Sequence, residues 1–522
     1  MGTKEDRPEL IFALVGAAGV RLEDLASALR DQLGFFGYTA VEIRLSDLLE
    51  NFDGWICQTA SGEFERITHL QSMGNGLRAR LRDGAALALA GIAEIRRLRA
   101  DASGDPDQPA AAHAYILRQL KHPDEVELFR RVYGPSFLLL AGHAPHRKRV
   151  EDFADLMARK AFLPGQGSRF QGNASDVIMI DEKQEDDFGQ DTRDTYPKAD
   201  FFANLAIPAG AHQVSRFVDL LFGHPFHTPA PEEYAMYQAS AVSLRSSDNN
   251  RQVGAAIVRL TRDGVGRITN TDIIAVGMNE VPRGGGGFYW DQDSPDNRDQ
   301  ALLIHKNEDR ATEIKISALA ELIEKMRDKS WLRSDICAGS SSELAESFLA
   351  DIGRTQFMKL SEFGRQVHAE MAALIDAARR GVAVDGLTMY VTTFPCHNCA
   401  KHIIAAGIER VVYLEPYPKS RASLLHGEEI ELESATGTRE EGKVVFSAFS
   451  GIAPRQYRRL FSMSERGIRK LADWHASRSS LLPLYVPKNA SLSYLAGERD
   501  ELKRLCLEAY RWDVAKIAPG LL

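Results

Sequence analysis

The sequence predicts an α/β protein in which a three-layer domain with a parallel sheet is followed by an α/β/α domain and a helical C-terminal region. Short apolar runs alternate with amphipathic stretches through the first part of the chain, which is typical of strands joined by helices. A pair of apolar runs and two helix–strand repeats follow, and the last part is mostly amphipathic. At 522 residues the chain exceeds what one hydrophobic core usually organises, so two or three domains are expected.

Residues 1–222 form the first expected domain. The strands are expected at LIFALVG, AYILRQL and FLLLAG, and the helices at LEDLASALRDQLGFFG and VEDFADLMARKAF. Because strands and helices alternate, the sheet is expected to be parallel and covered by helices on both faces. The densely charged segment 181–196 is expected to be a solvated loop.

A cluster of proline and glycine at residues 223–232 marks the boundary to the second expected domain, residues 223–440. This domain begins with a helix, EEYAMYQASAVSLRS, and a hairpin of two strands, QVGAAIVRL and DIIAVGMN. A polar, helix-rich insertion at residues 285–364 separates the hairpin from two helix–strand repeats. Residues 441–522 are expected to form a helical extension.

Composition narrows the classes of function. The chain carries 64 basic and 72 acidic residues, and a net charge of −8 argues against a protein that wraps nucleic acid. No stretch reaches membrane-spanning length and the N-terminus lacks a cleavage pattern, so a cytoplasmic protein is expected. Five cysteines are too few for a disulfide framework in a chain of this length.

Two of the cysteines lie in a pattern that predicts a catalytic zinc site. Cys396 and Cys399 begin a predicted helix, where both sulfurs lie on one face and the helix dipole favours thiolates. His368 begins another predicted helix and supplies a third ligand, which leaves the fourth tetrahedral position open, as in catalytic zinc sites. Glu370 is then placed as the general acid and base. His-x-Glu followed by Pro-Cys-x-x-Cys is the pattern of zinc deaminases.

Other interpretations of these residues are weaker. Cys-x-x-Cys alone also occurs in redox pairs and zinc knuckles, and His-x-Glu alone carries little information. A structural zinc site would usually have a fourth Cys or His ligand. His397 is the available residue, but its place in the helical turn directs its side chain elsewhere.

Beside the His-x-Glu segment, three segments resemble the deoxycytidylate deaminase branch of the cytidine deaminase superfamily within residues 232–420. They are SSDNNRQVGAAIV, GMNEVPRG and TTFPCHNCAKHIIAAGIERVVY. The resemblance implies that Asn279 hydrogen-bonds the base or sugar, that the Ala369 backbone meets the cytosine carbonyl, and that Arg251 contacts a phosphate. Alternatively, Asn279 is a turn residue before Pro282.

Two features depart from that family. Ala372 stands where the family usually has an asparagine in the first metal helix, so a contact to the sugar is absent or moved. The insertion also exceeds the connection of the compact enzymes. Both departures concern substrate size and regulation rather than the zinc chemistry.

A glycine-containing segment, Leu14–Leu25, follows a predicted strand and opens a helix, the setting of a phosphate-binding loop. Gly16 and Gly19 are its candidate phosphate-loop residues. The lysine and hydroxyl of a Walker A motif are missing, which argues against phosphoryl transfer. The first domain nevertheless resembles P-loop nucleoside-monophosphate kinases, as a degenerate member that either senses a nucleotide or serves as a scaffold.

Along nearly its whole length the chain resembles the bacterial anti-phage dCTP deaminases, in which such a domain precedes a deaminase. The segment LEPYPKSRASLLH supports this, and Tyr417 and Lys419 within it are candidate substrate contacts or plain loop residues. The resemblance implies a zinc enzyme that converts dCTP and dCMP to uracil nucleotides and depletes the precursor pool of a phage. It also implies a homo-oligomer and a nucleotide or small RNA regulator.

Three other functions remain open. A housekeeping dCMP deaminase would use the same catalytic residues, although the large flanking regions disfavour it. A polynucleotide cytosine deaminase would require a basic groove with stacking aromatic residues, which the acidic total disfavours. An interaction protein with a vestigial metal site is disfavoured by the intact Glu370.

Overall fold

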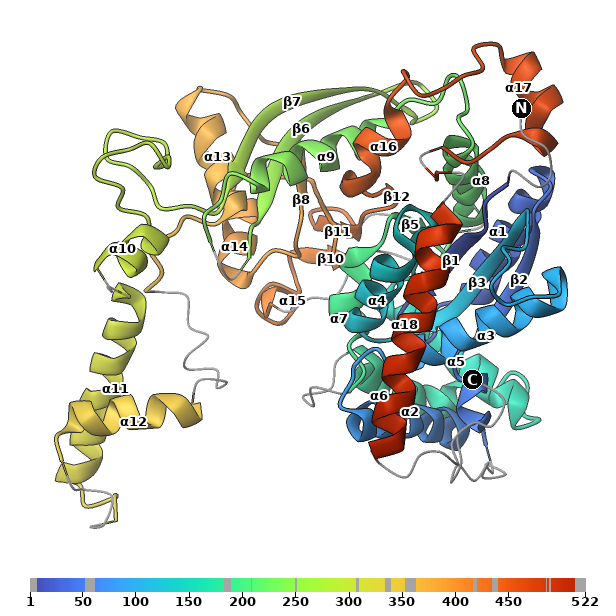
Figure 1. Cartoon of the computed structure of the whole chain (residues 1–522). Coiled ribbons are helices and arrows are strands. Elements are labelled where there is room, and N and C mark those ends of the chain that lie inside the picture. Colours follow the sequence, from blue (N-terminus) through green and yellow to red (C-terminus); the bar gives the residue numbers. More distant parts are fainter. Residues whose placement is uncertain are drawn as a thin grey trace.

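The computed structural model describes residues 7–51, 62–182, 189–207, 209–248, 251–306, 309–333, 339–352, 363–415, 420–433, 440–484, 486–487 and 490–511. The strands within these ranges form two six-stranded sheets, each dominated by parallel pairs. The first sheet and its helices lie beside the second, and the C-terminal part of the chain returns to the first (Figure 1). The expected mixed α/β class is confirmed.

The first sheet has the strand order β12-β5-β4-β1-β3-β2. Its strands are β1 (Leu10–Val15), β2 (Thr39–Arg44), β3 (His113–Leu120), β4 (Phe137–His143), β5 (Phe201–Asn204) and β12 (Gly451–Ile452). All pairs are parallel except β12 with β5. The sequence of β1 is apolar throughout and all six residues are buried, as expected for a strand covered on both faces.

Helices cover both faces of this sheet. Leu10, Phe12 and Leu14 pack with α1 and α8, whereas Ile11 and Val15 pack with α3 and α4. The helices of this part are α1 (Leu22–Phe35), α2 (Glu63–Leu81), α3 (Ala86–Ser103), α4 (Pro123–Tyr133), α5 (His146–Lys160), α6 (Gln171–Glu182), α7 (Thr192–Thr195) and α8 (Ala209–Leu221). The side chains of a strand alternate between faces, so β1 links two separate hydrophobic layers.

The ends of segment 181–196 differ from the expected solvated loop. Asp181 belongs to α6 and is buried, and Thr192 and Thr195 of α7 are fully buried. Residues 183–188, in the middle of this segment, lie outside the described residues. The dense charge of this segment favours exposure to solvent, and the local sequence does not show that its two ends are buried in the folded chain.

The second sheet has the order β10-β11-β9-β8-β6-β7. Its strands are β6 (Gly254–Arg262), β7 (Ile268–Met278), β8 (Thr388–Val391), β9 (Arg410–Tyr413), β10 (Ile430–Leu432) and β11 (Val444–Ala448). The hairpin β6–β7 and the pair β6–β8 are antiparallel, and the rest are parallel. One face packs on α9 (Pro231–Ser243) and the other on α13 (Ala369–Arg379) and α14 (His397–Ala405), in three layers.

The described residues of the segment expected as an insertion form three helices. They are α10 (Asp299–Lys306), α11 (Arg310–Asp328) and α12 (Ser341–Ile352). Helices α11 and α12 contact each other and project away from both sheets (Figure 1). None of the described helices has the length and apolar character needed to cross a membrane.

The expectation of a mostly helical extension over residues 441–522 does not hold for its first part. Strand β11 joins the second sheet and β12 joins the edge of the first. These strands are short and gain their pairing from strands elsewhere, so local patterning does not reveal them. The remaining elements are helices: α15 (Ala422–Leu425) lies before this region, and α16 (Tyr457–Phe461), α17 (Leu471–Ser477) and α18 (Ala490–Arg511) lie within it.

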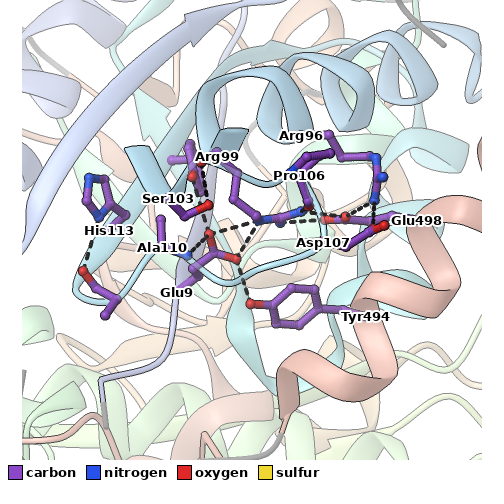
Figure 2. A network of polar contacts seen from close by, with 12 residues as sticks. Glu9, Arg96, Arg99, Ser103, Pro106, Asp107, Ala110, His113, Tyr494 and Glu498 are labelled. Atoms are coloured by element: carbon purple, nitrogen blue, oxygen red, sulfur yellow. Dashed lines mark hydrogen bonds and ion pairs between the residues drawn. The ribbon is translucent and has the colours of Figure 1, made fainter. Parts of the chain in front are cut away.

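A buried polar network attaches α18 to the first sheet (Figure 2). Arg99 of α3 pairs with Glu9 at 3.0 Å and with Glu498 of α18 at 2.7 Å, and all three side chains are fully buried. The Tyr494 hydroxyl of α18 donates to Glu9 at 2.6 Å. One guanidinium therefore serves two carboxylates, one from each end of the chain.

The hydrophobic core is continuous between the two sheets. Phe202 of β5 lies edge-to-face with Phe449, with ring centroids 6.0 Å apart. The same cluster extends to Ala256 of β6 and Tyr390 of β8 on the α9 face of the second sheet. The two sheets are thus joined by apolar packing, which fixes their relative position.

Candidate active site

The first metal helix is held against the hairpin by close backbone packing. Glu280 and Val367 form an isolated antiparallel bridge, so the chain enters α13 beside the end of β7. A Cβ at Gly277 of β7 would lie 2.3 Å from the Ala373 nitrogen, so only glycine permits this approach. His368 is the N-cap of α13 and Glu370 lies in its first turn, as the sequence predicts.

The second metal helix begins opposite the first. Cys396 is the N-cap of α14 and Cys399 lies in its first turn. The His368 Nδ1 atom lies 3.3 Å from the Cys396 Sγ and 3.4 Å from the Cys399 Sγ. Two helix N-termini therefore bring one imidazole and two sulfurs together, and their positive dipole ends favour thiolates.

The Glu370 carboxylate lies beside these donors. Its Oε2 atom is 3.4 Å from the Cys399 Sγ, and its side chain is almost completely buried. Burial raises the pKa of this carboxyl, so a proton is held more readily than on an exposed glutamate. In the metal-free donor set, the hydrogen bond from Cys399 lowers the pKa of the Cys396 thiol to about 4.

The donor set fits zinc. The ligand atoms of His368, Cys396 and Cys399 all lie within 4.8 Å of one another, and no fourth residue joins this group among the described residues. One imidazole and two thiolates suit zinc, and three protein ligands are typical of a catalytic site. His397 is not part of the group. Residues that the sequence singles out separately thus lie together in space.

Asn279, at the end of β7, contacts the loop that connects α9 to β6. The Asn279 side chain accepts a hydrogen bond from the Val253 nitrogen at 2.7 Å and donates to the Asp248 carboxylate and the Arg251 carbonyl, each at 2.9 Å. The hydrogen bond with Cys396 raises the pKa of His368, burial opposes this, and the charges of Cys396, Glu370 and Asp248 add to the increase in that order. Asn279 therefore holds the loop that approaches the metal donors.

Arg251 belongs to the same loop, between α9 and β6. It forms an ion pair with Glu415, which also accepts a hydrogen bond from the Thr393 hydroxyl at 3.0 Å. Arg251 and Glu415 line a cavity of about 520 Å³. Burial lowers the pKa of Arg251, and the charge of Asp194 opposes this.

The other residues that the sequence predicts to contact substrate or phosphate do not all lie at the metal donors. Ala369 is buried between His368 and Glu370 at the start of α13. Tyr417 and Lys419 lie outside the described residues. Gly16 and Gly19 follow β1 in the first sheet and are no part of the metal cluster.

The glycine turn after β1 has an internal carboxylate as its partner. The Asp181 carboxylate accepts from the Ala18 backbone N–H at 2.8 Å and pairs with the Lys121 Nζ at 2.5 Å. Gly19 has φ +85°, and a Cβ there would lie 2.7 Å from the Arg149 carbonyl oxygen. The turn thus keeps a conformation that favours glycine and presents an N–H to an anion.

Sequence reasoning missed several residues of this region. Glu280 accepts from the Ser247 nitrogen and hydroxyl at 2.9 and 2.8 Å and so fixes the loop beside Asn279. Its position next to Asn279 was the available signal. Asp248, Thr393 and Glu415 carry no distinguishing pattern, because their roles depend on contacts between distant segments.

Comparison with known proteins agrees with this geometry. Residues 229–415 match the family described as the cytidine and deoxycytidylate deaminase zinc-binding region. This stretch includes the three metal donors, Glu370, Asn279 and Arg251. The matched residues also include the helices α9, α13 and α14 and the strands β6, β7, β8 and β9 of the second sheet.

Individual relatives match over short stretches. A deoxycytidylate deaminase of Enterobacteria phage T2 is 48% identical over 56 residues, which are 11% of this chain and 30% of the relative. The ComE operon protein 2 of Bacillus subtilis (strain 168) is 49% identical over 53 residues, 10% of this chain and 28% of that protein. The chain thus spans less than a third of the length of these curated relatives.

One solved structure is similar over a longer stretch. The apo crystal structure of dCMP deaminase from the cyanophage S-TIM5 is 18% identical and covers 42% of this chain and 99% of its own, with a TM-score of 0.21.

Proposed function

We propose, from the deoxycytidylate deaminase zinc-binding region at residues 229–415, that this protein hydrolytically deaminates deoxycytidine nucleotides to deoxyuridine nucleotides. One observation carries the proposal: His368, Cys396 and Cys399 converge, and the Glu370 carboxylate lies 3.4 Å from one of the sulfurs. Three protein donors are the number typical of a catalytic zinc site, and a buried proton carrier lies next to these donors.

In this proposal each residue has a defined role. His368, Cys396 and Cys399 hold zinc, which when bound supplies Lewis-acid activation of water. Glu370 takes one proton from the water and delivers it to the ring nitrogen, and then carries a second proton from the added hydroxyl to the amino group, which leaves as ammonia. The Ala369 backbone meets the cytosine carbonyl. The loop that Asn279 holds orients the nucleotide, with Arg251 toward the phosphate.

The proposed substrates are dCTP and dCMP, and the proposed purpose is depletion of the precursor pool during phage infection. The resemblance of the whole chain to anti-phage dCTP deaminases supports this, and it extends the proposal to a cytoplasmic homo-oligomer controlled by a nucleotide or small RNA. A housekeeping dCMP deaminase is the second candidate, favoured by the names of the matching relatives.

The proposal assigns residues 1–222 to a P-loop kinase-like domain with a degenerate phosphate loop. The position of the glycine turn supports this assignment. The turn follows β1, which lies between β3 and β4 in the sheet. Strands β3 and β2 lie on one side of β1 and strands β4 and β5 on the other, so β1 is at the point where the strand order reverses. Open α/β sheets bind phosphates at such a point. Residues 223–440 carry the deaminase, extended by β11 beyond this boundary.

Turnover by the zinc-loaded protein tests the proposal. Wild type and Glu370→Ala are assayed for ammonia release from dCMP, dCTP and a cytosine-containing single-stranded DNA. Wild type is expected to deaminate free nucleotides, and the variant to lose about 10²–10⁴-fold in rate with its zinc retained. Equal and negligible turnover by both proteins would reject the enzyme, and preference for DNA would favour polynucleotide editing. Activity on dCMP alone would favour the housekeeping role.

A further inference from the structure

A cavity next to the candidate active site is built from three parts of the chain. Its volume is about 520 Å³, and its lining includes Arg130 and Lys198 from the first-sheet part, Arg251 and Glu415 from the second, and Arg455 from the C-terminal region. The part of the chain that matches the deaminase family ends at residue 415. Three of these five residues therefore come from outside the family match.

Hydrogen bonds connect two residues that line this cavity to Asn279 and to Thr393. The Arg251 carbonyl accepts from Asn279, which holds the loop beside the cluster. On the other side, Glu415 accepts from Thr393, only three residues before Cys396. A chain of three residues spans at most about 10 Å, so the Glu415 carboxylate is in hydrogen-bond contact with a residue whose backbone lies within about that distance of Cys396.

The basic groups of the cavity are gathered around one carbonyl. Arg130 donates to the Lys198 carbonyl, and Arg455 donates to the same oxygen at 3.0 Å. Both guanidiniums share the buried Asp200, at 3.6 and 3.3 Å. Burial lowers the pKa of Arg130, and the nearby charge of Arg455 lowers it further. Two like charges are thus held together with a single carboxylate between them, an arrangement that favours an additional anion.

One carboxylate of the cavity lining, Glu127, is largely exposed to solvent. Lys198 pairs with Glu127 at 2.7 Å, and the side chain of Glu127 is 53% exposed. Solvent screens such a pair, so it contributes little stability and is readily replaced by a more highly charged group. A phosphate offers more charge and more acceptor oxygens than one carboxylate, and arginine forks match its geometry.

We propose that this cavity binds the terminal phosphates of a deoxynucleoside triphosphate whose cytosine lies at the metal donors. Lys198 and Arg455 are then specificity-determining residues that distinguish a triphosphate from a monophosphate, with Arg251 common to both. This inference rests on the proposed deaminase function. It gives the first-sheet part and the C-terminal region a direct role in substrate selection.

Kinetics with two substrates test this inference. Lys198→Gln and Arg455→Gln are each expected to lower kcat/KM for dCTP about tenfold, mainly through KM, which corresponds to about 1.4 kcal/mol. Values for dCMP should stay within about twofold. The control is Lys443→Gln, because Lys443 also forms a lysine–glutamate pair, with Glu440 at 2.6 Å, but does not line the cavity. An equal loss for both substrates, or no loss for dCTP, would overturn the inference.

Binding of inorganic tripolyphosphate separates this inference from the proposed activity. Calorimetric titration of the zinc-loaded protein should show binding that weakens about tenfold in Lys198→Gln and Arg455→Gln and is unchanged in Lys443→Gln. Unchanged affinity in the first two variants would overturn the cavity assignment even in an active enzyme. Weakened tripolyphosphate binding in a protein that deaminates nothing would retain the anion site and reject the deaminase.

Discussion

The Asp181 carboxylate accepts a hydrogen bond from the Ala18 backbone N–H at 2.8 Å, so a side chain from α6 occupies the anion side of the glycine turn after β1. Lys121 pairs with the same carboxylate, and its Nζ also lies 3.4 Å from the Gly16 carbonyl. Asp181 therefore supplies an anion to this turn, and Lys121 supplies a cation. In a phosphate-binding loop the ligand supplies the anion and a lysine of the loop supplies the cation.

Removing that internal anion should create affinity for phosphate. In Asp181→Ala, the Ala18 N–H and the partly buried Lys121 lose their carboxylate, so unfolding free energy should fall by about 3–5 kcal/mol. Inorganic phosphate should restore part of the melting temperature in this variant and leave wild type unchanged. The control is Asp176→Asn, an exposed change on the same helix. A variant that phosphate does not stabilise would show that the turn is purely structural.

Zinc content should depend on the predicted ligands and be independent of the histidine between the cysteines. Cys399→Ser replaces a thiolate with a weak oxygen donor and should lose zinc in metal analysis of the purified protein. His397→Gln should keep one zinc per chain, because His397 is outside the donor group. Zinc loss in His397→Gln would instead indicate a closed, four-ligand structural site.

Stability should decrease in mild acid because of His224. Its Nδ1 atom accepts hydrogen bonds from the Phe226 and His227 nitrogens, both at 3.2 Å, which requires a neutral ring. Burial, followed by the neighbouring His227, lowers the pKa of His224 to about 4, and Asp219 opposes this. The unfolded chain binds more protons between this value and the ordinary pKa of about 6.5. The contribution of His224 is therefore complete above about pH 6.5 and is lost as the pH falls toward 4.

Denaturant unfolding at pH 7.5 and pH 5 measures this effect. His224→Asn keeps a side-chain acceptor for the two nitrogens and does not titrate, so its loss of stability between the two pH values should be smaller than in wild type. Equal losses in the two proteins would exclude His224 as the cause.

Mutation of the network that attaches α18 should lower the unfolding free energy far more than mutation of neighbouring surface ion pairs. Arg99→Met leaves the buried Glu9 without its cation and Glu498 with Arg96 alone, and should cost about 3–5 kcal/mol of unfolding free energy. Arg97→Met, on the same helix, removes exposed pairs with Glu94 and Asp101 and should cost less than about 1 kcal/mol. Limited proteolysis should then cut α18 faster in Arg99→Met alone. Equal cleavage rates would show that apolar packing, rather than this network, retains the helix.

Strong local patterns made much of the fold predictable. The apolar run of β1 and the amphipathic run of α1 give the expected elements because their burial follows directly from their own residues. The two strands beyond residue 440 were not predictable in this way, because β11 and β12 are short and pair with strands of two different sheets.

The candidate site also has a part that the sequence predicts and a part that it does not predict. The metal donors and Glu370 were identifiable because zinc chemistry restricts residue type and spacing. The engagement of Asn279 with Arg251, and of Arg251 with Glu415, arises from loops that meet only in the folded chain. Local sequence patterns do not predict such contacts between distant segments.

The pairing of β12 with β5 has a consequence for synthesis on the ribosome. The edge of the first sheet is completed by Gly451 and Ile452, which leave the ribosome after nearly all of the second sheet has been made. At ordinary rates of translation, residues 205–450 take roughly 10–50 s to add. During that interval the nascent chain carries β5 without its outer neighbour, and an unpaired strand edge is a template for association with other chains. Truncated products that end before residue 451 would keep that edge open permanently, so the last strand to be translated also protects the first sheet from aggregation.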